Sequence, residues 1–403
     1  MPDRRRQAWW GTSALFLVHG LIVSTWVSRI PAIQSGLHLA NGVLGLTLLA
    51  SALGAVSTIP IAGWSVTRYG SKKVTTVASI AFCLSILLPA LATNAVSLAC
   101  TLFVWGALAA AMDVSMNAQG VEVEKAMGNP TMSRFHGMFS LGGMLGAGAG
   151  GMVAARGIAT LPHFAISGVL NALVVVAIAG LLLDTHVAPA GTEHRLPFRK
   201  IPPVLLALSA IGFCILLAEG AIADWTAVYL RQVLHAGPGT AAAGYAVFSA
   251  AMAIFRFLGD AVTARLGPLR TLRAGSLVAA AGLLTALCAF SASWSLPGFA
   301  LAGAGFSVII PLVFGSGGRV EGISPGAGIA TVTGIGYAGF IVGPPAIGFA
   351  SQLVTLRYAL GIVVACCLIS ALLAKSVERL AHSPSSPDSQ PPEPGAPASG
   401  LYK

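Results

Sequence analysis

Charged residues are scarce in this sequence, and their scarcity excludes an ordinary soluble protein. Only 9% of the 403 residues are charged, whereas 56% are hydrophobic. A typical soluble domain carries roughly 25% charged residues, so a water-facing surface cannot be built from this composition. Hydrocarbon must therefore be the main solvent, and in hydrocarbon only helices or closed barrels satisfy their own backbone hydrogen bonds.

Alternation of polar and apolar residues is also missing, which excludes a membrane barrel. Barrel strands alternate over about 10 residues. Here the apolar runs are continuous, as in LVVVAIAGLLL (173–183) and IVVACCLISALLA (362–374). Such runs are typical of helices, and the sequence holds about twelve of them at the roughly 20 residues that a membrane span requires. The pattern predicts an all-α polytopic membrane protein.

Basic residues are unevenly distributed between the two sides of the predicted spans. With the N-terminus inside, 18 of the 23 Lys and Arg residues fall in inner segments. The outer loops hold four: Arg29, Arg156, Arg231 and Arg357. By the positive-inside rule, this asymmetry predicts a multi-pass protein of the cell membrane with both termini in the cytoplasm. The net charge of +10 thus reflects topology and does not indicate nucleic acid as a partner.

The polar segment 184–200 divides the spans into two groups of six. It predicts an N-terminal bundle over 1–183, a cytoplasmic central loop, and a C-terminal bundle over 201–380. Residues 381–403 are rich in Pro, Ser and Gly, a composition that predicts a disordered tail. The halves echo one another, since His19 and Glu219 occupy equivalent places. Parallel repeats of this kind place binding sites near the midplane, between the halves.

A basic motif follows the second span: Gly63-Trp-Ser-Val-Thr67-Arg68-Tyr-Gly70-Ser-Lys72-Lys73. With twelve spans in a 6+6 repeat, it resembles the major facilitator superfamily over the whole chain except the tail. The resemblance implies the major facilitator fold and a cytoplasmic gate latched at this loop, with Arg68 as a gating residue. The family usually has Asp where Thr67 stands here. Because this acid is missing, the resemblance does not establish that the loop of the first half acts as a latch. The second half retains an acid, Asp260, at its counterpart.

Four further stretches resemble the MosC/YbjJ-like branch of this superfamily. They are TWVSRIPAIQ (25–34), MDVSMNAQGVEVE (112–124), SRFHGMFSLGG (133–143) and EGAIADWTAVYL (219–230). The resemblance points weakly toward inosamine-like cargo, because the branch itself is poorly defined in substrate.

Four acids lie inside predicted spans, together with one base. They are Asp113, Glu219, Asp224, Asp260 and Arg256. A charge at the centre of a bilayer costs roughly 2.5–3.5 kcal/mol on insertion scales, so each of these residues is a candidate functional group.

Glu219 and His19 are predicted to face each other across the central cavity, on the seventh and first spans. We expect them to form a proton-sensitive pair beside the substrate, since a histidine titrates near neutral pH. The alternative is a protonated Glu219 hydrogen-bonded to a neighbouring helix, with a structural His19. Asp224 lies five residues beyond Glu219, on a different face, and is either a hydrated rim residue or a further substrate group.

A second polar patch is predicted toward the cytoplasmic side. Asp113 and Asn117 are four residues apart and share one helix face, as do His136 and Ser140 on the next span. These groups either line an inward-open cavity or clamp packed helices together. Arg256 and Asp260 form a further i, i+4 pair, read as a structural or gating salt bridge. Tyr337, in a glycine-rich span, is a weaker candidate for the cavity.

No Walker loop, zinc-ligand spacing, nucleophile elbow or dinucleotide fingerprint is present. We therefore expect no enzymatic activity and no cofactor. The sequence favours a secondary transporter that moves a small polar solute, such as a sugar, polyol or inosamine-like compound, by alternating access. Proton coupling, contact with membrane lipid and a monomeric state are expected. The rivals are an exporter of drugs or metabolites on the same fold and a transport-inactive receptor or scaffold.

Overall fold

The structure is a computed structural model that describes residues 3–129, 131–184 and 201–381, with the backbone alone at 260 and 378–381. Within these ranges every regular element is a helix. The helices are α1 (Arg4–Gly36), α2 (Asn41–Tyr69), α3 (Ser71–Ser85), α4 (Leu87–Ala90), α5 (Ala95–Met127), α6 (Met132–Ala155), α7 (Thr160–Ile178), η1 (Ala179–Leu181), α8 (Pro203–Gln232), α9 (Pro238–Leu266), α10 (Pro268–Cys288), α11 (Ala292–Phe306), α12 (Ile309–Gly317), α13 (Pro325–Leu353), α14 (Leu356–Ala359) and α15 (Gly361–Ala381).

Twelve helical segments in the described part of the chain are long and apolar enough to cross a membrane. This number confirms the prediction of about twelve spans. Four spans are built from two consecutive helices each, namely α3 with α4, α7 with the short η1, α11 with α12, and α14 with α15.

Two of the composite spans break for the same chemical reason. Pro89 and Pro311 have no N–H to donate to the carbonyl group four residues earlier, which belongs to Ser85 and Ser307 respectively. Helix α3 ends at Ser85, and α11 ends one residue before Ser307. The Ser307 hydroxyl donates to the carbonyl of Ala304 at 2.7 Å, within its own turn. A proline therefore sets each kink.

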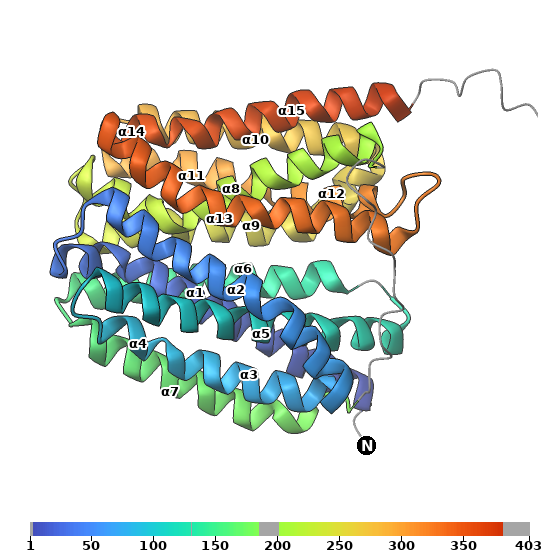
Figure 1. The fold of residues 1–403 in the computed structure, drawn as a ribbon, viewed down its shortest axis with the longest axis horizontal. Coiled ribbons are helices and arrows are strands. Elements are labelled where there is room, and N and C mark those ends of the chain that lie inside the picture. Colours follow the sequence, from blue (N-terminus) through green and yellow to red (C-terminus); the bar gives the residue numbers. More distant parts are fainter. Residues whose placement is uncertain (1–2, 130, 185–200, 382–403) are drawn as a thin grey trace, which may run out of the picture.

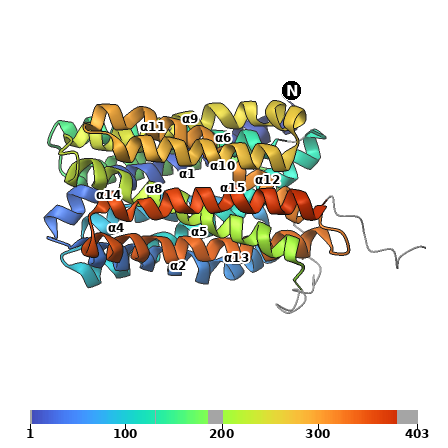
Figure 2. The same ribbon diagram turned by 90° about the horizontal axis from the view of Figure 1, so that it is seen from above.

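The spans form two six-helix bundles that lie side by side, as predicted. Figure 1 shows α1–α7 (blue to green) as one bundle and α8–α15 (light green to red) as the other. The view from above in Figure 2 shows that the long helices of both bundles run along a common direction. The linker predicted at 184–200 and the tail predicted at 381–403 lie outside the described residues, apart from Asp184 and Ala381, so these boundaries stay predictions.

Helices α2 and α9 end alike, at equivalent places in the two bundles. Each is followed by a glycine in the left-handed region, Gly70 with φ 86° and Gly267 with φ 80°, where a side chain would be strained. We call this end of the molecule, which holds Arg68 and Arg265, the inner end, because the positive-inside rule predicts that it faces the cytoplasm. The opposite end is called the outer end.

At the outer end the two bundles are in close contact through α2 and α13. Gly45 packs so tightly against α13 that a Cβ there would lie 2.7 Å from the carbonyl oxygen of Pro344. In Figure 1 the two helices converge on the side of α14 and separate toward the inner end. The two bundles are thus closed against each other at the outer end.

Candidate functional site

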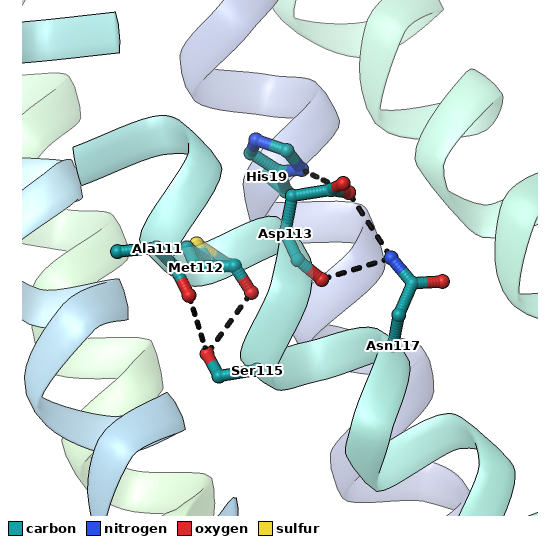
Figure 3. Close-up of polar contacts among 6 residues, drawn as sticks. All are labelled: His19, Ala111, Met112, Asp113, Ser115 and Asn117. Atoms are coloured by element: carbon teal, nitrogen blue, oxygen red, sulfur yellow. Dashed lines mark hydrogen bonds and ion pairs between the residues drawn. The ribbon is translucent and has the colours of Figure 1, made fainter. Parts of the chain in front are cut away.

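A polar cluster lies at mid-depth in the first bundle, between α1 and α5 (Figure 3). The His19 Nδ1 atom is 4.0 Å from Asp113 Oδ1, within ion-pair range if the imidazole is protonated. Asn117 donates from Nδ2 to the Asp113 carboxylate at 3.1 Å and to its backbone carbonyl at 2.8 Å. The i, i+4 spacing of Asp113 and Asn117 therefore brings them together as predicted from the sequence.

His19 is surrounded by aromatic side chains, and the acid nearest to it is Asp113. The residue is 6% exposed, and its ring lies 5.1 Å from the ring of Phe82 and 5.4 Å from that of Phe139. Neither imidazole nitrogen has a hydrogen bond. The Asp113 side chain, by contrast, is 37% exposed. Its carboxylate is therefore accessible, whereas the imidazole of His19 is enclosed.

The sequence predicted a pair of His19 with Glu219, but the structure does not pair these two residues. No ion pair joins these two residues in the described part of the chain, and the acid beside His19 is Asp113. The sequence analysis compared equivalent positions in the two halves and so missed a neighbour within the same half. The position of Asp113 at the centre of its span was the feature of the sequence that could have indicated this pairing.

Glu219 lies half-buried on α8, in the second bundle, without a hydrogen bond to any described residue. Its carboxylate interacts electrostatically with the guanidinium of Arg256 and the phenol of Tyr245, both on α9. Asp224, also half-buried, acts on Tyr245 as well, so it is not a fully exposed rim residue. The sequence analysis did not single out Tyr245, because nothing in its apolar surroundings distinguished it.

Tyr337 lies half-buried on α13, in the second bundle. Its ring lies 5.9 Å from that of Phe340. The charges of Asp113 in the first bundle and of Glu219 in the second act on its phenol, although no hydrogen bond joins the three residues in the described part of the chain.

Arg256 forms a direct link between the bundles, closer to the inner end. Its Nη1 donates to the Ser140 hydroxyl at 2.6 Å and to the backbone carbonyl of His136 at 3.0 Å, both on α6. The His136 ring stands edge-on to Phe16 at 5.3 Å. The predicted pair of Arg256 with Asp260 stays a prediction, because the side chain of Asp260 is outside the described residues.

Beside this link lies a cavity of about 250 Å³ between α6, α9 and the junction of α11 with α12. Its lining includes Met132, His136, Arg256, Thr263, Val308 and Phe314. The volume is just below the roughly 300–1,000 Å³ of pockets for drug-sized ligands, so it suits a smaller molecule.

Arg68, the predicted gating residue of the first half, is exposed at the end of α2. Its guanidinium carbon lies 5.9 Å from the centroid of the Tyr69 ring, a cation–π contact. Its predicted role in a latch stays a prediction.

A cluster of three amides, which the sequence analysis missed, joins the bundles at the outer end. Gln232 of α8 donates to Gln34 Oε1 at 3.1 Å and to Asn41 Oδ1 at 3.2 Å. Gln34 donates to Asn41 Oδ1 at 2.8 Å, and Asn41 donates back to Gln232 Oε1 at 3.2 Å. We call Gln34, Asn41 and Gln232 the outer amide cluster. The sequence feature that could have indicated this cluster is an amide side chain at one end of each of three helices.

Comparison with known proteins agrees with this architecture. Residues 11–319 match the model of the Major Facilitator Superfamily, which is more than half of the chain. The chain belongs to this superfamily. It is 34% identical over 369 residues to an uncharacterized MFS-type transporter of Yersinia pestis, covering 91% of this chain and 95% of that protein.

Two further similarities support the branch and the fold. The chain is 30% identical over 363 residues to the membrane protein MosC of Rhizobium meliloti, covering 87% of each, which confirms the resemblance to the MosC-like branch. Among solved structures, a mutant of the nucleoside transporter NupG superposes with a TM-score of 0.73 at 13% identity, covering 93% of this chain and all of that one. The protein is a multi-pass membrane transporter and not an enzyme.

Proposed function

We propose that the protein is a proton-coupled secondary transporter that moves a small polar solute across the cytoplasmic membrane by alternating access. The observation that carries this proposal is the cluster of His19, Asp113 and Asn117, in which an ionisable pair 4.0 Å apart lies within membrane-spanning helices. Glu219 and Asp224 place two further acids in a span of the second bundle. Hydroxylated or amine-bearing solutes, such as sugars, polyols and inosamine-like compounds, match the carboxylates, amide, imidazole and phenol of these spans.

The acids are suited to carry protons because their charge is costly at this depth. An ionised carboxylate in the membrane interior costs a few kcal/mol unless it is paired or protonated. Asp113 has His19 and Asn117 as partners, and Glu219 has the field of Arg256. Protonation of Glu219 removes its attraction for Arg256, which then favours the hydrogen bonds that Arg256 makes to α6. The proton therefore acts on a contact between the two bundles.

Alternating access requires that the outer end and the inner end open in turn. The outer amide cluster and the contact of Gly45 with Pro344 hold the outer end closed. Each hydrogen bond between neutral groups contributes about 0.5–1.5 kcal/mol. The bonds of the outer amide cluster can therefore hold the outer end closed and still be broken when it opens. We assign both termini to the cytoplasm and a single chain as the working unit.

An exporter of metabolites on the same fold is the second candidate. The inner cavity favours it, because Met132, Val308 and Phe314 give that cavity an apolar wall. An exporter of this kind predicts lower toxicity of lipophilic compounds when the protein is expressed.

Reconstituted protein in liposomes tests the proposal. Uptake of labelled sugars, inositols, amines and lipophilic cations is measured with and without an inward proton gradient, in wild type and in Glu219→Gln. We expect gradient-driven uptake of a polar solute in the wild type and its loss in the variant, with solute exchange retained. Uptake of a polar solute that ignores the gradient would overturn the proton coupling. Transport of lipophilic cations alone would favour the exporter.

A further inference from the structure

Arg29 differs from the other three arginines that the sequence assigns to outer loops. It lies within α1, in the stretch TWVSRIPAIQ, and is 4% exposed. Arg156 and Arg231 are exposed, and Arg357 is half-buried. The prediction of a loop position for Arg29 was therefore wrong, and its burial requires an explanation that the transport site does not provide.

The Arg29 guanidinium is only partly satisfied. Its Nη2 donates to the carbonyl of Ile158 at 2.7 Å and to the Thr160 hydroxyl at 3.3 Å, in the turn between α6 and α7. The Nε and Nη1 atoms are buried and have no hydrogen-bond partner. These two atoms carry three of the five N–H groups of an arginine side chain. More than half of its donors are thus closed off from water and unpaired.

No acid of the first bundle is in a position to neutralise this charge. Residues 4–112 and 125–183 contain no Asp or Glu at all, so α1, α6 and α7 are free of acids. Asp113 lies at mid-depth beside His19, and Glu122 and Glu124 follow it toward the inner end. An arginine is always charged, and burying a charge without a counter-charge is strongly unfavourable. Among the described residues no ion pair joins Arg29 to an acid of the second bundle either, so a negative charge from outside the chain would satisfy it.

A second unpaired base lies one helical turn from a partner of Arg29. Arg29 donates to Thr160 at the start of α7, and His163 follows three residues later on the same helix. His163 is 8% exposed, and its Nδ1 is buried without a hydrogen-bond partner. Ser28, the neighbour of Arg29, and His163 both pack on Gly150 of α6, where a Cβ would lie 3.3 Å from the His163 Cε1 atom. Two enclosed nitrogen-bearing side chains with unused donors thus meet where α1, α6 and α7 come together.

We propose that Arg29 and His163 bind a chloride ion at the outer end of the first bundle. Nε and Nη1 of Arg29 and Nδ1 of His163 are the donors, and the anion supplies the negative charge that the chain lacks. A monatomic anion is favoured because all three nitrogen atoms are enclosed and a small ion needs the least space. This site is independent of the transport site and of the solute carried.

Thermal unfolding of the purified full-length protein in an uncharged detergent tests the site. Chloride is exchanged for gluconate at constant ionic strength, and the midpoint is followed by tryptophan fluorescence. We expect the midpoint to rise with the logarithm of the chloride or bromide concentration once that concentration exceeds the dissociation constant, because a ligand that binds only the folded state stabilises it. Identical midpoints in chloride and gluconate would overturn the proposal, since the site would then hold water alone.

Variants locate the anion. His163→Gln should raise the chloride concentration at which the midpoint begins to rise by roughly tenfold, as expected for a lost hydrogen bond to a charged group. Arg29→Gln should abolish the response. Arg156→Gln, which changes an exposed arginine in the same region, is the matched control and should respond like the wild type. If Arg29→Gln does not fold, two other results test the assignment. They are the chloride response of His163→Gln and a bromide peak at Arg29 in anomalous diffraction. An unchanged response in His163→Gln, with no bromide at Arg29, would overturn the assignment.

Discussion

Arg256 on α9 donates a hydrogen bond of 2.6 Å to the Ser140 hydroxyl on α6, and this contact joins the two bundles toward the inner end. The donor is charged and comes from one half, whereas the acceptor is neutral and comes from the other. Rocking of one bundle against the other must break the bond. The bond is therefore part of the energy difference between the two open states.

Ser140→Ala should shift the protein away from the state described here, whose outer end is closed, and toward the outward-open state. A hydrogen bond to a charged group contributes about 1.5–3 kcal/mol, which corresponds to a shift of at least about tenfold in the equilibrium. Spin labels on exposed positions of α2 and α13 at the inner end measure the distance distribution. Ser133→Ala is the matched control, since Ser133 lines the same cavity without a hydrogen bond to a described residue. Equal distributions for Ser140→Ala and wild type would contradict this role.

Gln232→Leu should open the outer end. The substitution removes the two bonds that Gln232 donates to Gln34 and Asn41 and the one that it accepts from Asn41. At about 0.5–1.5 kcal/mol each, their loss favours the outward-open state by about 1.5–4.5 kcal/mol. The reactivity of a cysteine in place of Ser351, a buried residue of similar size near the outer end of α13, reports the opening to a membrane-impermeant reagent.

Ser35→Ala is the control for the outer amide cluster. The Ser35 hydroxyl lies at the same end of α1 but donates only to the carbonyl of Ala32 in its own helix, at 3.1 Å. It should leave the reactivity unchanged. If Gln232→Leu behaves like Ser35→Ala, the outer end is held closed by the packing of α2 on α13 and not by the amides.

Asp113→Asn should uncouple transport from protons. The variant keeps a polar side chain beside His19 but has no carboxylate to pair with a protonated imidazole. We expect gradient-driven uptake to fall to background while solute counterflow continues. Asn117→Ala should have a smaller effect, because it removes a hydrogen bond to the carboxylate and leaves the acid in place.

Ser115→Ala is the control for this cluster, and it is drawn in Figure 3. The Ser115 hydroxyl bonds to the carbonyls of Ala111 and Met112 within α5, at 2.8 and 3.1 Å, and does not reach the cluster. Both modes of transport should persist. Loss of counterflow together with uptake in Asp113→Asn would mean that Asp113 binds the solute and does not carry the proton.

The contrast between Asp113 and Glu219 shows what the sequence predicts and what it does not. Hydropathy and the spacing of Asp113 and Asn117 depend on local geometry, so the spans and the shared helix face follow directly from the sequence. The partner of His19 depends on how α1 packs against α5, which no periodicity encodes. The outer amide cluster was missed for the same reason, because its three residues lie on helices from both bundles.

Two glycines on α2 give a direct test of the packing on which the fold depends. A Cβ at Gly54 would collide with the backbone carbonyl oxygen of Phe103 on α5, whereas Gly63 has open space at the corresponding position. Backbone cannot move aside as a flexible side chain does, so Gly54→Ala forces α2 and α5 apart. Overpacking of this kind costs about 1–3 kcal/mol.

Gly63→Ala serves as the matched substitution, because it adds the same methyl group to the same helix. Alanine is favoured over glycine inside a helix by roughly 0.5–1 kcal/mol, so this variant should be as stable as the wild type or slightly more so. Thermal midpoints in detergent measure both effects, and we expect a lower value for Gly54→Ala alone. Equal midpoints for the two variants would mean that α2 and α5 adjust at this crossing without cost, and that their close approach does not contribute to the stability of the first bundle.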